Sequence, residues 1–193
     1  LLKGSKIPGN IIPDRFLKHL RYTEFAKTSG WRIVRIATHP AVQGKGIGSC
    51  VLGKISEEAS RLGLDWVGAG FGVNEQLLRF WVKNGYVPVH LSPDRNPVSG
   101  EYTILVIQPI SDKAGKLIEM ARGEFKSKIL NSITVNYREM EPEIALLLLD
   151  SKPYIHSEKP VDLVTPVAID RLWTYCQGPM TFEAAADIMF KLA

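Results

Sequence analysis

The sequence predicts a mixed α/β fold followed by a small all-helical tail. Two apolar, strand-like segments, 31–38 and 64–71, flank a helical pattern at 47–62. A helix that joins two neighbouring strands implies that they run parallel. Two more strand-like segments, 86–91 and 101–108, are separated by a polar loop and predict an antiparallel hairpin. Beyond this hairpin the apolar residues recur at helical spacing. The sheet is therefore expected to be mixed, and the tail helical.

Glycines crowd the junction between the first strand and its helix. Gly44, Gly46 and Gly48 alternate with other residues, and the helical pattern begins at Ile47. Glycine lets a ligand approach the backbone closely, and its amide groups can converge on an anion. A helix N-terminus adds partial positive charge at the same place. A phosphate or pyrophosphate is therefore expected on residues 43–49. The helix face that should be buried comprises Ile47, Val51, Leu52, Ile55, Ala59 and Leu62.

The glycine spacing excludes two common phosphate motifs. No Gly-x-x-x-x-Gly-Lys-Ser/Thr run occurs, and Ser49 stands where a dinucleotide fingerprint needs its third glycine. The pattern Gln/Arg-x-x-Gly-x-Gly does fit, through Gln43, Gly46 and Gly48. A glycine-rich turn that binds nothing is the alternative interpretation.

The remaining elements follow from local signals. Residues 15–25 could form a short helix, Gly63 suits the position just after a helix, and Asn74 suits the N-cap of a helix at 75–83. Cys50 is expected to be a small core residue. The tail is expected to hold helices at 114–133 and 142–149, a loop at 151–160, a helix opened by Pro166 and broken at Gly178, and a helix capped by Thr181 that reaches Leu192.

Several blocks of sequence point to a known family. The Gln43–Gly46–Gly48 pattern resembles the acetyl-CoA loop of the GCN5-related acetyltransferases. The blocks RIATHP, FGVNEQLLRFW and SGEY make residues 7–110 similar to the acetyltransferase module of the tRNA(Met) cytidine acetyltransferase family. The likeness extends more loosely into the tail. Members of that family make N4-acetylcytidine, and the eukaryotic RNA cytidine acetyltransferases are similar.

This resemblance implies a domain organisation. Residues 1–110 would be the C-terminal part of a GCN5-related acetyltransferase domain, and residues 111–193 a helical, possible tRNA-binding domain. Such a domain normally begins with three further strands and one or two helices, so the mixed sheet is expected to lack its N-terminal strands. The family's upstream ATPase-helicase module, with its ATP site, is expected to be absent as well, since the sequence has no P-loop.

The resemblance also assigns roles to residues. Main-chain groups of Ile36, Ala37 and Thr38 would pair with the pantetheine amides of acetyl-CoA. Lys83 matches a basic cofactor-contacting position, whereas Gln76 stands where the family commonly has Glu. No metal is expected. The residues expected to hold the pyrophosphate are Gln43, Gly44, Lys45, Gly46, Ile47, Gly48 and Ser49.

His39 is the leading candidate for a catalytic residue. It ends the first strand, close to the expected thioester, and an imidazole can accept the proton that the attacking amine must lose. The alternative is that His39 only caps the strand or hydrogen-bonds the loop. His90, Tyr86 and Tyr102 are weaker candidates, and Trp66, Phe80 and Trp81 are expected in the core.

Composition sets limits on the partners. No apolar run approaches the ~20 residues of a membrane span, and the two distant cysteines suggest a reducing cytoplasm. Residues 1–110 hold 14 basic and 8 acidic side chains, and residues 111–193 hold 10 and 12. The basic first part suggests tRNA or another RNA as partner, or only a solvated face. The oligomeric state is left open by the sequence.

The sequence therefore predicts acetyl-CoA-dependent N4-acetylation of cytidine in tRNA, by direct transfer to the exocyclic amine. Two alternatives remain. One is an acetyltransferase for a protein or small-molecule amine, which shares the same loop. The other is a non-catalytic RNA-binding or assembly module, whose binding to RNA would depend on Lys18 and Arg21.

Overall fold

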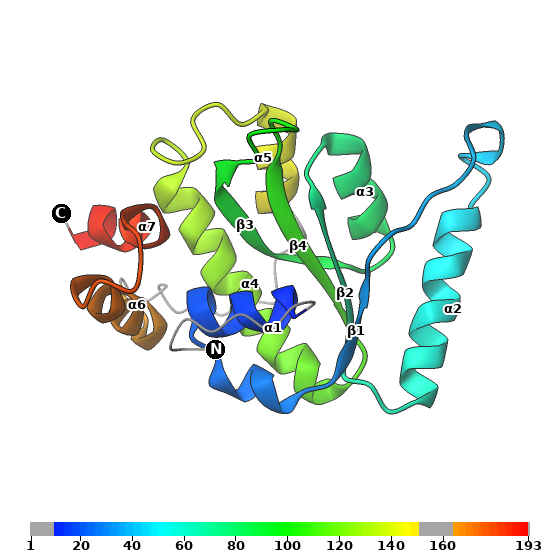
Figure 1. Ribbon diagram of the computed structural model, residues 1–193, viewed down its shortest axis with the longest axis horizontal. Coiled ribbons are helices and arrows are strands. Elements are labelled where there is room, and N and C mark those ends of the chain that lie inside the picture. The colour runs from blue at the N-terminus through cyan, green and yellow to red at the C-terminus, as the bar shows by residue number, and fades with distance from the viewer. Residues whose placement is uncertain (1–9, 151–163, 193) are drawn as a thin grey trace.

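The computed structural model describes residues 10–150 and 164–192, and in these residues it shows one four-stranded sheet with helices on both faces (Figure 1). The strand order is β1–β2–β4–β3, with β1 and β2 parallel and the other pairs antiparallel. The predicted mixed sheet, hairpin and helical tail are confirmed. The strands are β1 (Gly30–Ile33), β2 (Trp66–Gly72), β3 (Val87–Arg95) and β4 (Tyr102–Pro109).

Helices connect the strands and form the tail. The predicted loop at 151–160 lies outside the described residues. No helix within the described ranges combines the length and apolar character that a membrane span requires. The α-helices are α1 (Ile11–Arg15), α2 (Ile47–Arg61), α3 (Glu75–Lys83), α4 (Asp112–Ser132), α5 (Pro142–Asp150), α6 (Pro166–Cys176) and α7 (Phe182–Leu192). The π-helix η1 (Phe16–Leu20) and the 3₁₀ helices η2 (Thr23–Lys27) and η3 (Pro40–Val42) complete the helical segments.

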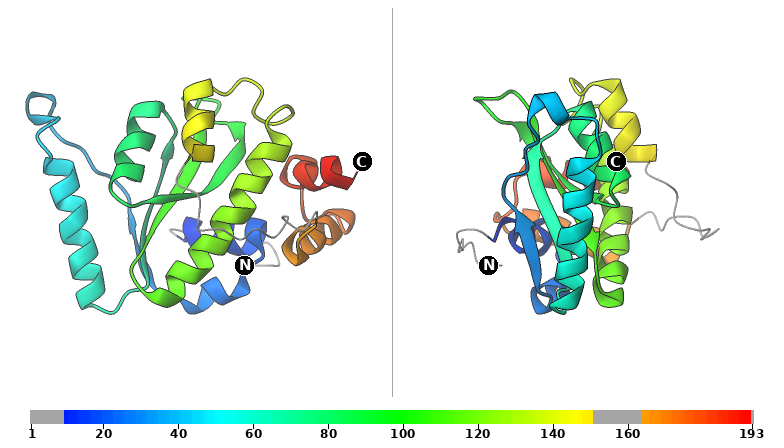
Figure 2. Two further views of the ribbon diagram at one scale, coloured as in Figure 1. Left: turned by 180° about the vertical axis from the view of Figure 1, so that it is seen from behind. Right: turned by 90° about the vertical axis from the view of Figure 1, so that its right-hand side faces the viewer.

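Alternate side chains of β2 face two different cores, as expected for a strand covered on both sides. One face, called here the α3 face, carries Val67, Ala69 and Phe71, which pack with Leu52 of α2 and with Leu78 and Trp81 of α3. The opposite face, called here the α1 face, carries Trp66, Gly68, Gly70 and Gly72, and Trp66 packs there with Ile12 of α1 and Phe16 of η1. Helix α4 contributes to both cores, while α2 and the α6–α7 pair lie at opposite ends of the molecule (Figure 2).

Asp65, just before β2, connects three elements. Its carboxylate accepts hydrogen bonds from the Ser29 N–H at 2.8 Å and from the Ser111 hydroxyl at 2.7 Å. These hydrogen bonds lower the pKa of Asp65, the Ser29 contact first. Ser111 is in turn the N-cap of α4 and accepts from the Ala114 N–H. The starts of β1, β2 and α4 are thereby fixed to one another.

The prediction of a strand at 31–38 is wrong at its C-terminal end. Pairing of β1 with β2 ends at Ile33 and Ala69, while β2 continues to Gly72 with β4 as its partner. A neighbouring strand gains stability from cross-strand side-chain contacts, and glycines at 70 and 72 offer none on the α1 face. The chain beyond Ile33 therefore leaves the sheet, and the Val34 side chain is 68% exposed.

Three other expectations also need correction. Of the predicted apolar face of α2, only Leu52 and Ala59 are buried, and Cys50 is exposed because its side of the helix faces away from the sheet. Strand β3 runs through the predicted loop as far as Arg95, since the Thr103 N–H bonds to the Ser92 hydroxyl across the hairpin. The segment predicted as one short helix is α1, η1 and η2, broken by a left-handed residue at 21.

The boundary predicted at residue 110 stays a prediction. Side chains of α4, such as Ala114 and Phe125, belong to the two cores of the sheet, so α4 packs as part of the first domain. Helix α6 begins as predicted, with Thr165 capping it through a hydrogen bond from the Ala168 N–H.

A buried polar cluster joins the tail to the sheet. The rings of His19 in η1 and His90 in β3 lie 4.9 Å apart, and Lys128 of α4 is buried near them. Arg171 of α6 pairs with Asp187 of α7 through two hydrogen bonds of 3.0 and 2.7 Å. Burial, then the neighbouring cations, lowers the pKa of His19 to about 3 and that of His90 well below its usual value.

These two histidines predict acid-sensitive folding. Both native pKa values lie below 6.5, so in the acidic range the unfolded chain binds protons that the native chain does not. Stability is then present above pH 6.5 and is lost as pH falls, by about 2 kcal/mol for His19 between pH 6.5 and 5, and His90 acts in the same direction. Urea unfolding at both pH values should show a shallower pH dependence for His19→Gln than for the wild type. An equal dependence in both proteins would contradict this interpretation.

Candidate functional site

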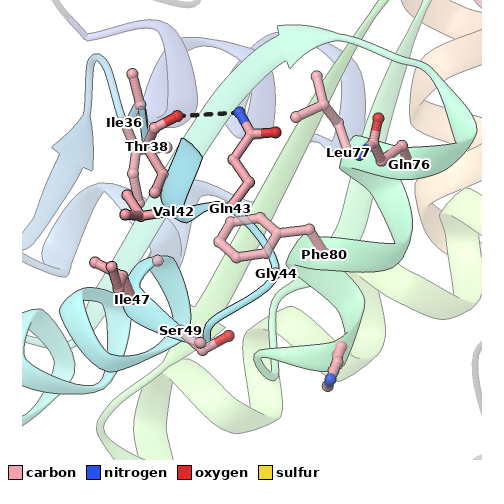
Figure 3. Close-up of a pocket in the computed structure, with 14 residues that line it drawn as sticks. Ile36, Thr38, Val42, Gln43, Gly44, Ile47, Ser49, Gln76, Leu77 and Phe80 are labelled. Carbon is pink, nitrogen blue, oxygen red and sulfur yellow. Dashed lines mark hydrogen bonds between the residues drawn. The ribbon is translucent and has the colours of Figure 1, made fainter. Parts of the chain in front are cut away.

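A pocket of about 540 Å³ opens between the segment that leaves β1 and helix α3 (Figure 3). It lies on the α3 face, because its lining residues Ile36 and Phe80 pack against that core. The pocket brings together most residues that the sequence singled out, namely Ile36, Ala37, Thr38, Gln43, Gly44, Gly46, Ile47, Gly48, Ser49, Gln76 and Lys83. Lys45 and His39 are not among its lining residues.

The glycine loop has a backbone conformation that other residues rarely adopt. Gly44 and Gly46 have φ values of +77° and +80°, in the left-handed region. Gly46 is the N-cap of α2, and no side chain caps this end of the helix. The first-turn N–H groups of α2 are consequently available to an anion at the pocket wall.

Gln43 holds the loop against the chain that precedes it. Its side-chain Nε2 donates a hydrogen bond of 3.0 Å to the carbonyl oxygen of Thr38, drawn as the dashed line in Figure 3. Within the described residues, no hydrogen bond is found for the main-chain groups of Ile36 and Ala37. The pocket thus presents unpaired peptide groups on one wall and helix amides on another.

Helix α3 forms the third wall. Asn74 caps it by accepting a hydrogen bond of 2.9 Å from the Leu77 N–H. The Phe80 ring projects from α3 toward the loop, and a Cβ on Gly48 would lie 3.1 Å from its Cζ atom (Figure 3). A glycine at 48 therefore lets the two walls approach closely.

Three lining residues, Val42, Leu77 and Phe80, were not predicted to belong to the site. Phe80 was expected in the core because aromatic residues usually pack there. Residues four and seven positions after Gln76 fall on its side of a helix, so the spacing of Phe80 and Lys83 from Gln76 was an available signal.

Charge in this pocket favours an anionic ligand. Among the described residues that line it, Lys83 carries the only charge, and none is acidic. The described residues also contain no group of three or more His, Cys, Asp or Glu side chains arranged to hold a metal ion. A cation beside free helix amides is the arrangement expected for phosphate binding.

His39 lies at the edge of this site. It is exposed and serves as the N-cap of η3, with its Nδ1 accepting a hydrogen bond of 3.2 Å from the Ala41 N–H. The weaker candidates His90, Tyr86 and Tyr102 are buried and do not line the pocket. The structure therefore does not bring these three to the candidate site.

Comparisons with known proteins show which family the chain resembles. The family model described as GNAT acetyltransferase 2 matches residues 1–61 and 50–111. The tRNA(Met) cytidine acetyltransferase TmcA of Thermofilum pendens is 51% identical over 187 residues, which are 97% of this chain and 23% of that protein. The TmcA of Pyrococcus abyssi is 46% identical over 192 residues, 100% of this chain and 23% of that protein. The chain thus spans about a quarter of the length of these relatives.

One solved structure shows a partial likeness. The structure described as the NatC complex bound to Gag peptide and CoA overlaps 42% of this chain and 50% of its own chain, with a TM-score of 0.38 and 17% identity. An overlap this partial does not bear on the function.

The cap of α3 can be tested directly. Asn74→Ala removes the acceptor for the Leu77 N–H and should lower the free energy of unfolding by about 1 kcal/mol. Amides near Gln76 should also exchange faster with deuterium, because the first turn of the pocket wall frays. The matched control is Asn84→Ala at the other end of α3, which removes the 2.7 Å hydrogen bond from Asn84 Nδ2 to the Phe80 carbonyl but should leave exchange near Gln76 unchanged. Unchanged exchange near Gln76 in the first variant would contradict the assigned cap.

Proposed function

The chain belongs to the GNAT acetyltransferase 2 family, and we propose that it forms the acetyl-CoA-binding part of an enzyme that acetylates N4 of cytidine in tRNA. The observation that carries the proposal is the uncapped N-terminus of α2, which faces a pocket with one cation and no acid. Two relatives named as tRNA(Met) cytidine acetyltransferases, at 51% and 46% identity, support this choice of substrate.

The pocket residues fit the three parts of acetyl-CoA. The pyrophosphate would lie on the amides of residues 46–49, where the glycine at 46 leaves open space for it. Lys83 would add a point charge, and exposed Lys45 at the loop tip can reach the same phosphates. The unpaired main-chain groups of Ile36 and Ala37 would bond the pantetheine amides, as a neighbouring strand would.

A glutamine at position 76 is compatible with an anionic ligand, although the family commonly has Glu at this position. Its side chain lies in the first turn of α3 and lines the pocket. A carboxylate there would repel a polyanion, whereas an amide can donate a hydrogen bond to it. The substitution is thus compatible with a bound coenzyme.

When bound, acetyl-CoA supplies the acetyl group as a thioester. The chain's own contribution is to hold the thioester where β1 and β2 separate and to position the cytidine amine against it. Removal of a proton from the amine is also needed as the carbon–nitrogen bond forms.

The RNA partner and its setting are part of the same proposal. The first 110 residues carry the excess of basic side chains, which supports binding to a polyanion. Lys18 and Arg21, however, are paired with Asp14 and Asp170 at 3.0 and 2.5 Å. Reversing their charges would break these pairs, so such variants would report on folding as well as on RNA.

Our proposal includes the wider protein and its location. An upstream ATPase-helicase module of the same protein would use ATP, and the enzyme would work in the cytoplasm, where the free thiols of Cys50 and Cys176 would stay reduced. The helical tail would help to bind tRNA.

Calorimetry with acetyl-CoA tests the cofactor site. Gly46→Asp places a negative charge where the pyrophosphate should lie, and it should weaken binding about 100-fold, or about 2.7 kcal/mol. The Cβ meets no atom within 4 Å, but the φ of +80° strains any side chain at this position, so the control has to carry a similar strain. The matched control is Gly63→Asp just after α2, which puts the same side chain in open space at a φ of +69° and should bind like the wild type. Equal weakening in both variants would place the coenzyme elsewhere.

The acetylation assay tests the substrate. The intact protein that carries this chain, given tRNA, acetyl-CoA and ATP, should yield N4-acetylcytidine on digestion and mass spectrometry of the RNA. Acetylation of peptides or polyamines without RNA would instead support a different amine substrate.

A further inference from the structure

Strands β1 and β2 stop pairing before β2 ends, and this unpaired stretch between them is called here the opening. Pairing stops at Ile33 and Ala69, yet β2 continues through Gly70 to Gly72 with β4 alone beside it. Within the described residues, no strand pairs with this last part of β2 on its β1 side. The candidate acetyl-CoA pocket borders the opening on the α3 face, because it is lined by the diverging chain and by α3.

A carboxylate lies on the other side of that opening. On the α1 face, the side chain of Glu101 sits directly over Gly72, and a Cβ on Gly72 would overlap its Oε2 atom. Gly70, one pleat back on the same face, is exposed. The absence of a side chain at 72 is thus what allows the carboxylate to lie against the strand, next to the gap.

The Glu101 carboxylate has no partner among the described residues. Its side chain is half-buried, and in residues 10–150 and 164–192 it takes part in no hydrogen bond or ion pair. Glu75, at the start of α3, is by contrast paired with Arg79 at 2.8 Å. A half-buried carboxylate without a donor retains its lone pairs for a ligand.

The transfer reaction needs such an acceptor. The N4 amine of cytidine is weakly basic and has to lose a proton once its nitrogen bonds to the acetyl carbon. The ring of His39 is badly placed for this, since its Nδ1 already accepts the Ala41 N–H and its neutral form then carries a proton on Nε2. His39 is therefore arranged as a donor.

We propose that Glu101 is the catalytic residue that accepts this proton, with the cytidine bound on the α1 face and the acetyl donor on the α3 face. The inference rests on the proposed function. The N4 lone pair forms the new carbon–nitrogen bond, the carbon–sulfur bond breaks, and one N4 proton passes to the Glu101 carboxylate. The leaving thiolate takes up one proton and Glu101 releases one, so charge and protons balance.

The geometry explains why the two reactants approach from opposite sides. A carboxylate on the α3 face would lie beside the phosphates and weaken coenzyme binding. On the α1 face, the sheet separates it from the helix amides of α2, and it remains next to the gap where the thioester would lie.

Three variants of the intact protein that carries this chain test the proposal. Glu101→Gln keeps the size and removes the proton acceptor, so kcat for N4-acetylcytidine should fall by a factor of about 10²–10⁴. Acetyl-CoA binding by calorimetry should stay within about threefold of the wild type, because the opposite face holds the coenzyme. Glu101→Asp retains a carboxylate and should recover part of the lost kcat. The matched control is Asp94→Asn in the same hairpin, which should act like the wild type.

The outcomes separate this inference from the proposed function. Full activity of Glu101→Gln, alongside an active wild type, would overturn the role of Glu101 and leave the proposed function standing. Loss of acetyl-CoA binding together with kcat would show that Glu101 acts through the fold, and would also overturn it. A wild type that makes no N4-acetylcytidine in RNA would refute the proposed function, and the role of Glu101 in that reaction with it.

Discussion

The early end of the β1–β2 pairing is the constraint on which the rest of the site depends. Because a right-handed helical connection joins two parallel strands, the loop and the start of α2 must lie at the carboxyl ends of both strands. Had the pairing continued beyond Ile33, β2 would pair with those peptide groups that point toward it, whereas the groups of Ile36 and Ala37 have no partner among the described residues. Their lack of partners makes this stretch an open strand edge, available to a ligand that carries amides of its own.

Electrostatics divides the two faces of the sheet. On the α3 face, a helix N-terminus and Lys83 surround the pocket without an acidic neighbour. On the α1 face, the unpaired Glu101 lies over Gly72. A phosphate and a carboxylate in one cavity would repel each other, and the positive potential that binds the phosphate would weaken the carboxylate as a proton acceptor. With the phosphate-binding groups and Glu101 on opposite faces of the sheet, each has a suitable environment. Both still lie next to the same gap between β1 and β2.

The sequence predicted those features that depend on local chemistry. Asn74, Gly63 and Thr165 mark helix ends because capping depends on a few neighbouring atoms, and the glycine loop was found for the same reason. Other features depend on which strands lie side by side. These are the early end of β1, the exposure of Cys50 and the contact of Glu101 with Gly72. Periodicity cannot supply that information, because a half-exposed strand and an extended segment outside the sheet show similar apolar patterns.

The tail illustrates why net charge alone is a poor guide to a partner. Of its carboxylates, Asp187 pairs with Arg171 of the same tail, and Asp170 pairs with Arg21 of the segment that precedes the sheet. Asp170 thus helps to dock the tail, whereas Asp187 joins α6 to α7 within it. The junction already holds two buried cations, Lys128 and Arg171, beside the uncharged His19 and His90. Another buried positive charge there would be unfavourable. Charge at the junction therefore acts mainly on how the tail is held.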